Sequence, residues 1–169
     1  MKDESLSPEE EVELERILDI AEVTAIGFAS GYTVYTKFME SVIHLMQQVK
    51  IGAMVSTISG PAMMDARRDI VEGFLNDTAC QYLLMLDTDI EFSVSDVLTA
   101  LSHVSYSKSD PVVSGLYVDS AGFRVAGNFN PDGGYQPLAE PPTSPTAVDC
   151  AGCGFVLIPR TVLESTLHT

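Results

Sequence analysis

Short continuous apolar runs alternate along the chain with segments whose apolar residues recur every three or four positions. Runs of this kind are typical of buried strands, and they cover 23–29, 51–55, 82–86, 111–118 and 154–158. The periodic segments predict amphipathic helices, and they cover 34–49, 66–75 and 97–104. The alternation predicts an α/β fold, an open and mostly parallel sheet with helices on both faces.

Both ends of this pattern carry helix-start features. Ser7, Pro8 and Glu10 form a capping box with proline at the first helical position, which predicts a helix to about Ala21. Its partly apolar face could dock on the body or on a neighbouring subunit, making a homo-oligomer, and the alternative is a solvated acidic tail. We therefore divide the chain into an acidic helical arm, 1–22, and one domain, 23–169. A second helix start is Pro159–Glu164.

Two segments interrupt the regular pattern. Ser56–Pro61 is rich in turn residues and predicts the end of the strand that begins at Ile51. From Asp119 to Thr146, Gly, Pro, Asn and Asp crowd in and the periodicity fades. We expect a short hairpin strand at Phe123–Asn130, followed by a loop, and we expect 119–146 to be the least ordered part of the body.

Charge narrows the classes of partner. The formal net charge is −15, with only nine Lys and Arg residues, so nucleic acid and anionic membranes are disfavoured. An anionic ligand such as a nucleotide diphosphate would need a metal ion to bridge it to carboxylates. A leader-type apolar region and any apolar run of about 18 residues are missing from the sequence, so we expect a cytoplasmic chain without a membrane span. Three cysteines fit a reducing compartment, and the lone C-x-x-C at Cys150–Cys153 is weak evidence for zinc.

Candidate chemistry gathers at the end of the run Tyr82–Leu86. Asp87, Thr88 and Asp89 follow that run directly, where the carboxyl end of a parallel strand opens onto the ligand crevice of an α/β sheet. In an extended chain the two carboxylates would point to one side and Thr88 to the other. Oxygen donors of this kind favour Mg²⁺ or Mn²⁺. The alternative is a pair of acidic residues capping a turn.

An ordered series of sequence blocks gives the chain a family resemblance. The blocks are Ala66–Val71, Phe74-Leu75, Tyr82–Ile90, Val113–Tyr117 and Gly152–Arg160. Together they resemble the family-2-type GT-A glycosyltransferases, including short bacterial and phage members, over roughly Val23 to Leu163. The resemblance implies a nucleotide-binding, Rossmann-like GT-A fold and transfer of a sugar from a UDP- or GDP-type donor to an unknown acceptor.

The resemblance also assigns roles to residues. Asp87 and Asp89 match the D-x-D that meets the metal, Mn²⁺ or Mg²⁺, and the donor, with Thr88 between them. Three groups match donor-binding positions: the first loop, an arginine ahead of the D-x-D strand, and a small-residue loop beside the sugar. These residues are Ala29, Ser30 and Gly31; Arg67; and Gly152 and Gly154.

Departures from the family pattern keep other functions open. Arg68 stands where the family commonly has Asn, and the family's acidic catalytic residue and later His would lie beyond His168-Thr169. We therefore expect a C-terminally incomplete domain that recognises the donor but transfers sugar poorly, with an unassigned catalytic base. One alternative is a non-catalytic nucleotide-sugar-binding or assembly protein. A HAD-type phosphatase is less favoured, because the Gly or Thr that such an enzyme usually has soon after its second Asp is missing after Asp89 in this chain.

Overall fold

Two sheets and five helices make up the described part of the chain. The computed structural model describes residues 6–31, 34–58, 63–106, 111–117 and 126–167. The larger sheet has five strands in the order β2-β1-β3-β8-β4. Its strands are β1 (Thr24–Ser30), β2 (Ala53–Ile58), β3 (Tyr82–Leu86), β4 (Val113–Ser114) and β8 (Phe155–Pro159).

Strand direction in this sheet is mixed. β1 pairs in parallel with β2 and with β3, whereas β8 runs antiparallel to both β3 and β4. The predicted α/β class is confirmed, and β8 is the exception to a sheet otherwise parallel in the described part of the chain. The sequence run that became β8 is as apolar as the others, so its composition carried no information about direction.

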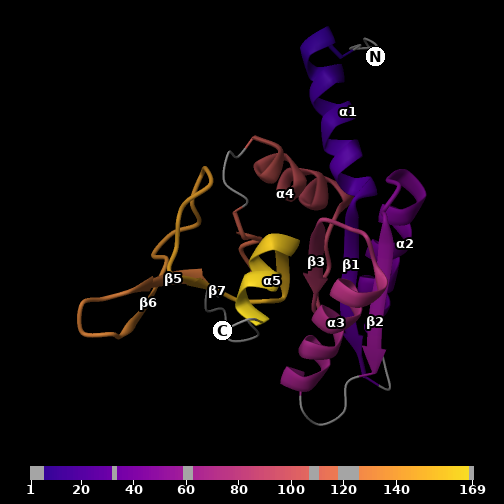
Figure 1. Ribbon diagram of the computed structural model, residues 1–169. Coiled ribbons are helices and arrows are strands. Elements are labelled where there is room, and N and C mark those ends of the chain that lie inside the picture. The colour runs from indigo at the N-terminus through magenta and orange to yellow at the C-terminus, as the bar shows by residue number, and fades with distance from the viewer. Residues whose placement is uncertain (1–5, 32–33, 59–62, 107–110, 118–125, 168–169) are drawn as a thin grey trace.

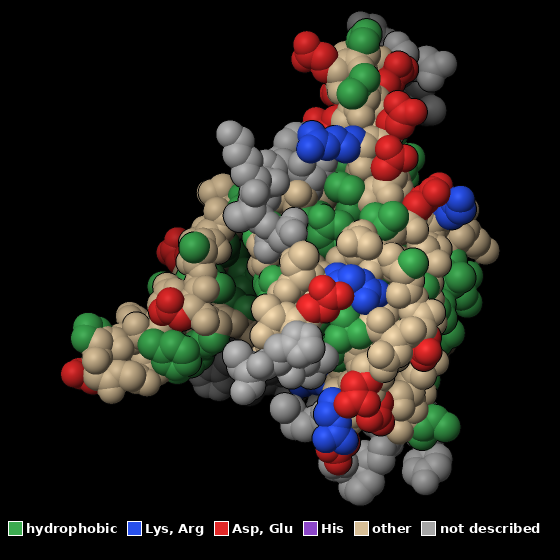
Figure 2. Space-filling model, in the orientation of Figure 1, with side chains coloured by type: hydrophobic (Ala, Val, Ile, Leu, Met, Phe, Trp, Pro, Cys, Tyr) green, Lys and Arg blue, Asp and Glu red, His purple; other side chains and the backbone are tan. Residues whose placement is uncertain are grey.

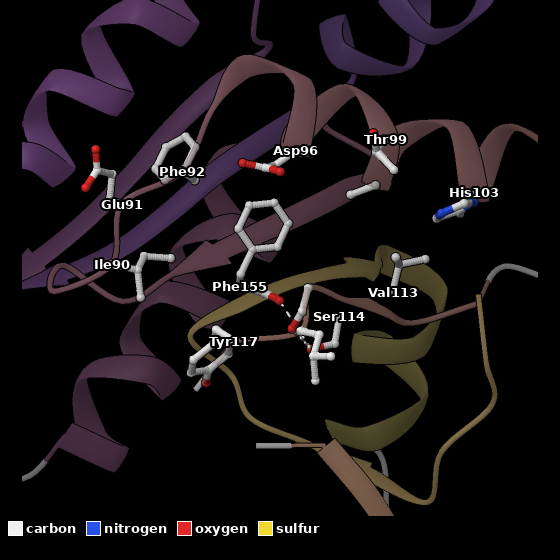
Figure 3. A pocket seen from close by; sticks show the side chains of 13 residues that line it. Ile90, Glu91, Phe92, Asp96, Thr99, His103, Val113, Ser114, Tyr117 and Phe155 are labelled. Atoms are coloured by element: carbon white, nitrogen blue, oxygen red, sulfur yellow. Dashed lines mark hydrogen bonds between the residues drawn. The ribbon is translucent and has the colours of Figure 1, made fainter. Parts of the chain in front are cut away.

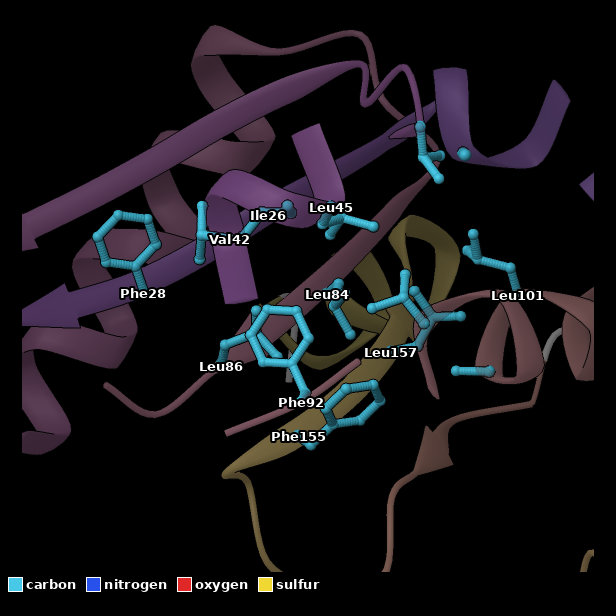
Figure 4. Packing of buried hydrophobic residues seen from close by; sticks show 14 of the residues in the cluster. Ile26, Phe28, Val42, Leu45, Leu84, Leu86, Phe92, Leu101, Phe155 and Leu157 are labelled. Atoms are coloured by element: carbon cyan, nitrogen blue, oxygen red, sulfur yellow. The ribbon is translucent and has the colours of Figure 1, made fainter. Parts of the chain in front are cut away.

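Helices cover both faces of the sheet (Figure 1). They are α1 (Pro8–Glu22), α2 (Thr36–Gln48), α3 (Met63–Asp77), α4 (Val94–Tyr106) and α5 (Arg160–Leu167). One face packs Ile26, Leu84 and Leu157 against α2 and α4 (Figure 4). Phe38 of α2 is fully buried in the same cluster. The other face packs Leu83 and its neighbours against α3 and α5. Within the described ranges, no helix combines the length and apolar character needed to cross a bilayer.

The N-terminal helix projects from the body as an arm (Figure 1). Ser7 caps it with the predicted capping box, and it ends at Glu22, one residue past the predicted end. Only Ile17 and Ala21 are buried, and they join the core beside α4, so the last turns of the arm dock on the body. Acidic side chains gather along the projecting part (Figure 2). Self-association through this arm stays a prediction.

Two predicted strand boundaries are wrong. β2 continues through Ser56 and Thr57 to Ile58, because these residues pair with 28–30 of β1 and this pairing overrides their local turn preference. The strand predicted over 111–118 is reduced to Val113–Ser114, with one further bond from the Gly115 N–H to the Phe155 carbonyl. Val118 lies outside the described residues.

A small second sheet, in the order β6-β5-β7, stands apart from the main one (Figure 1). Its strands are β5 (Ala126–Phe129), β6 (Tyr135–Pro137) and β7 (Cys150–Ala151). β5 lies within the hairpin strand expected at Phe123–Asn130, of which 123–125 lie outside the described ranges. Its partner β6 lies in the segment expected to be a loop, so that part of the expectation is wrong. Gly133, in the turn between these two strands, has a φ of 80°, a conformation that glycine adopts at little cost. That 119–146 is the least ordered part of the body stays a prediction.

Candidate functional site

Most of the predicted site residues lie around the C-terminal ends of the neighbouring strands β1 and β3. These two strands are parallel neighbours, with Phe28 paired to Leu86, so their carboxyl ends open onto the same side. The residues predicted as the first loop begin inside the strand, since Ala29 and Ser30 are the last two residues of β1 and pair with β2. This end of β1 lies next to the D-x-D after β3. The Thr88 hydroxyl donates a hydrogen bond of 3.5 Å to the Ala29 carbonyl, which joins the two segments directly.

A cavity of about 170 Å³ occupies this junction. Its wall includes six predicted site residues: Ala29, Gly31, Arg67, Asp87, Thr88 and Asp89. Ser30 is not part of that wall, and its hydroxyl donates instead to the Thr57 carbonyl of β2. The structure thus brings together most of the residues that the sequence singled out, from three separate segments of the chain.

The D-x-D segment is a turn and not an extended chain. Thr88 and Asp89 form a turn directly after β3, so the predicted alternation of side chains along a strand is wrong. Asp87, Thr88 and Asp89 all line the same cavity. The turn therefore places both aspartates and Thr88 in the wall of one cavity.

Arg67 forms an ion pair with Asp87 across the cavity wall. Its Nη2 donates to both carboxylate oxygens of Asp87, at 2.9 and 3.1 Å. The two side chains are only 25% and 31% exposed, so Arg67 is not a free surface charge of α3. Burial lowers the pKa of Arg67, but the hydrogen bond and the charge of Asp87 outweigh it and leave that pKa above its ordinary value. A fixed positive charge therefore lies beside the D-x-D.

Asp87 and Asp89 are the residues of this cavity that could hold a divalent cation together with a bound phosphate. Nowhere in the described part of the chain do three His, Cys, Asp or Glu side chains come together as a metal-binding group. Mg²⁺ commonly uses one or two carboxylates and completes its shell with substrate phosphates and water. Asp87 and Asp89 both line this cavity, and a cation bound at Asp87 would have to share that carboxylate with Arg67, whose Nη2 donates to both of its oxygens.

The small-residue loop lies behind the D-x-D rather than in the cavity wall. The Asp87 N–H donates to the Gly154 carbonyl at 2.8 Å, and the Gly152 carbonyl accepts a bond of 3.3 Å from the Ser114 hydroxyl. A Cβ on Gly154 would lie 2.7 Å from the ring of Tyr117, so this close approach requires glycine. Gly154 positions the main chain of Asp87.

Tyr117 is a site residue that the sequence did not single out. Its hydroxyl oxygen accepts a 2.7 Å hydrogen bond from the Gly154 N–H. Burial raises the pKa of the Tyr117 phenol and the charge of Asp87 adds to this rise, against the Gly154 hydrogen bond. The phenol therefore keeps its proton at neutral pH. Its place within the block Val113–Tyr117 was the one available sequence clue.

A second and larger cavity, of about 320 Å³, lies between α4 and the β4 segment (Figure 3). Its wall starts at Ile90, the residue after Asp89, and includes Tyr117 and Phe155. Sequence reasoning did not predict it. Such a cavity forms only when α4, β4 and β8 come together, and these elements are far apart along the chain.

Comparison with known proteins gives a likeness in fold. No protein-family model matches the chain, and no curated protein matches it in sequence. Among solved structures, the chain is similar to A197 from STIV, with a TM-score of 0.55 and 19% sequence identity. The match covers 83% of this chain and 66% of that one, so the chain spans just under two thirds of A197. At this identity, the likeness bears on the arrangement of helices and strands alone.

Proposed function

We propose that the chain binds a nucleotide-diphosphate sugar through a divalent cation held by Asp87 and Asp89, and that it acts as a metal-dependent glycosyltransferase of the GT-A type. The observation that carries this proposal is the meeting of three segments on one cavity at the end of parallel strands. They are the D-x-D with Asp87 and Asp89, Arg67 of α3, and the end of β1 with Ala29 and Gly31. In open α/β sheets this is where nucleotide ligands bind. The fold is compatible with a nucleotide-binding, Rossmann-like half domain.

The charges of the site suit a diphosphate. A chain with a net charge of −15 repels anions, so binding needs a local positive charge. Arg67 supplies one, and its planar guanidinium group can match two phosphate oxygens. In the structure one of its nitrogens, Nη2, donates to both oxygens of Asp87. When bound, Mn²⁺ or Mg²⁺ would supply a second positive charge and stabilise the diphosphate as a leaving group.

The proposed reaction makes one bond and breaks another. The bond between the anomeric carbon and the diphosphate oxygen breaks, and its electron pair leaves with the diphosphate. The acceptor's hydroxyl oxygen bonds to the same carbon and loses its proton to a base. Asp87 and Asp89 would hold the cation that stabilises the leaving group, with Arg67 beside them, and Ala29 and Gly31 would contact the nucleotide.

Calorimetry with UDP and with GDP tests the proposal. In Mn²⁺ we expect one of the two nucleotides to bind, and in EDTA we expect its affinity to fall by about tenfold or more, because the carboxylates would then face the phosphates without a bridge. Binding that is equally tight in EDTA would contradict the metal bridge.

Two variants localise the effect. Asp89→Asn removes one exposed carboxylate from the cavity wall, and we expect it to weaken nucleotide binding in Mn²⁺ by about tenfold or more. Asp132→Asn makes the same change on the exposed hairpin turn, and we expect no loss. If both variants bind as the parent does, the site is misplaced. Release of labelled sugar from the donor then separates an enzyme from a protein that only binds it.

A further inference from the structure

The larger cavity has an aromatic floor and polar walls. Phe92 and Phe155 pack edge to face, with ring centroids 6.1 Å apart, and both line it. Figure 3 shows Phe155 between side chains of α4, including Thr99 and His103, and those of the β4 segment, including Ser114. Its volume of about 320 Å³ lies at the small end of the range that small-molecule sites usually have.

This cavity adjoins the D-x-D cavity through a short path of bonded groups. Asp89 lines the first cavity, and the next residue, Ile90, lines the second. Tyr117 lines the second cavity, and its hydroxyl oxygen accepts a hydrogen bond from the Gly154 N–H. The Gly154 carbonyl in turn accepts a hydrogen bond from the Asp87 N–H. A ligand in the larger cavity would therefore lie beside the group that holds the donor.

The charged side chains described in its wall are both acidic, which disfavours an anionic ligand. Among the residues that the structure describes, the wall contains two carboxylates, Glu91 and Asp96, and neither Lys nor Arg. Both carboxylates already have partners, since Glu91 forms an ion pair of 3.0 Å with Lys37 and Asp96 accepts from the Ser93 N–H and hydroxyl. A cation would have to compete with these partners. The wall therefore favours a neutral ligand.

Hydrogen-bonding groups remain available for such a ligand. Within the described residues, neither the His103 imidazole nor the Thr99 hydroxyl has a protein hydrogen-bond partner, and both line the cavity. Their positions are four residues apart on α4, so they share one face of that helix. Hydroxyl groups of a ligand can bond to both while its carbon atoms rest on the rings of Phe92 and Phe155.

We propose that this cavity binds a neutral saccharide, through a single sugar ring, and that this saccharide is the acceptor. The acceptor role rests on the glycosyltransferase function proposed above, because only then does a donor lie beside it. The binding itself rests on the aromatic floor and on the polar groups of α4 that have no protein partner among the described residues.

Amide chemical shifts of the ¹⁵N-labelled chain test this proposal. The probes are the methyl glycosides of glucose, galactose, mannose and N-acetylglucosamine, each added without nucleotide or metal. We expect at least one of them to shift the amides of Thr99, His103 and Ser114 in a saturable way. We expect glucose 6-phosphate to bind at least about tenfold more weakly, because its charge meets Glu91 and Asp96.

Two matched variants test the residues. His103→Leu should lower the affinity for the saccharide by about fivefold to tenfold, the range expected for the loss of one or two net hydrogen bonds. His44→Leu makes the same change at an exposed position of α2 and should leave the affinity unchanged. Thr99→Val, at an exposed position, repeats the test with little effect on folding.

The outcomes separate this proposal from the nucleotide site. If no glycoside shifts these amides, if glucose 6-phosphate binds equally well, or if His103→Leu and Thr99→Val have no effect, the saccharide site is wrong, whatever the nucleotide calorimetry gives. If the glycosides bind and UDP and GDP do not, the saccharide site stands, and the acceptor role falls together with the glycosyltransferase function.

Discussion

Arg160 shows how one side chain joins two elements. It begins α5, and its guanidinium group donates to the main-chain carbonyls of Phe74, Leu75, Thr78 and Cys80 at distances of 2.7 to 3.2 Å. The same group lies 4.5 Å from the centroid of the Phe74 ring. It therefore satisfies carbonyls at the C-terminal end of α3 that the helix itself leaves unpaired.

We predict that Arg160→Lys lowers the free energy of unfolding by about 2–4 kcal/mol, because an ammonium group cannot reach several carbonyls at once. Arg68→Lys is the matched control on α3, where the side chain is 62% exposed and forms only long ion pairs, and its effect should stay within about 0.5 kcal/mol. Urea denaturation of both variants measures the difference. Equal effects would show that the bonds of Arg160 contribute little.

Most residues that line the first cavity could be predicted from the sequence. The hydrogen bonds that hold the neighbouring main chain in place could not. Asp87 could be found because it lies at the end of an apolar run, and strand ends mark the ligand side of an α/β sheet. Arg67 and Ala29 were assigned through the family resemblance, and both line the same cavity. The bond from Gly154 to Tyr117 joins residues 37 positions apart. No local pattern specifies such a contact, so it emerged only from the packing of β8 against β4.

At the scale of elements, two helices begin with the same device in different surroundings. Ser7 caps α1 and Ser93 caps α4, each by accepting from the N–H three residues later. The first turns of α1 are exposed on the projecting arm, whereas α4 buries Val97 and Leu101 in the core. The same cap should therefore matter differently for the stability of the whole domain.

We predict that Ser93→Ala lowers the free energy of unfolding by about 1 kcal/mol, because it removes a cap from a helix that is part of the cooperative core. Ser7→Ala should change it by less than about 0.3 kcal/mol, because fraying of an exposed arm does not require global unfolding. Thermal unfolding followed by circular dichroism compares the two variants. An equal loss in both would mean that the arm folds as one unit with the body.

Some elements could be placed from the sequence because local preference and packing agree in them. Tyr82–Leu86 is predicted and observed with the same bounds, since five apolar residues between polar flanks fit only a buried position. Where pairing decides, the sequence is insufficient: β2 extends to Ile58 because β1 continues beside it, and β4 is short because few residues face β8. The direction of a strand is also set by its pairing, since β8 runs antiparallel to β3 and β4 although its sequence is as apolar as that of the parallel strands.

At the scale of the whole molecule, charge complicates any test with metal ions. The net charge is −15, and acidic side chains gather on the arm (Figure 2). Such a surface attracts divalent cations weakly at many places. Binding of Mn²⁺ by itself is therefore weak evidence, and the location of the ion has to be measured.

Paramagnetic line broadening by Mn²⁺ in the presence of saturating UDP or GDP locates the ion. With substoichiometric Mn²⁺, the proposed function predicts that the amides of Ala29, Gly31, Thr88 and Asp89 broaden first, and that this broadening requires the nucleotide and is lost in Asp89→Asn. If broadening begins along the acidic arm, 8–22, while those four amides keep their line widths with nucleotide present, the metal-bridged nucleotide site is contradicted.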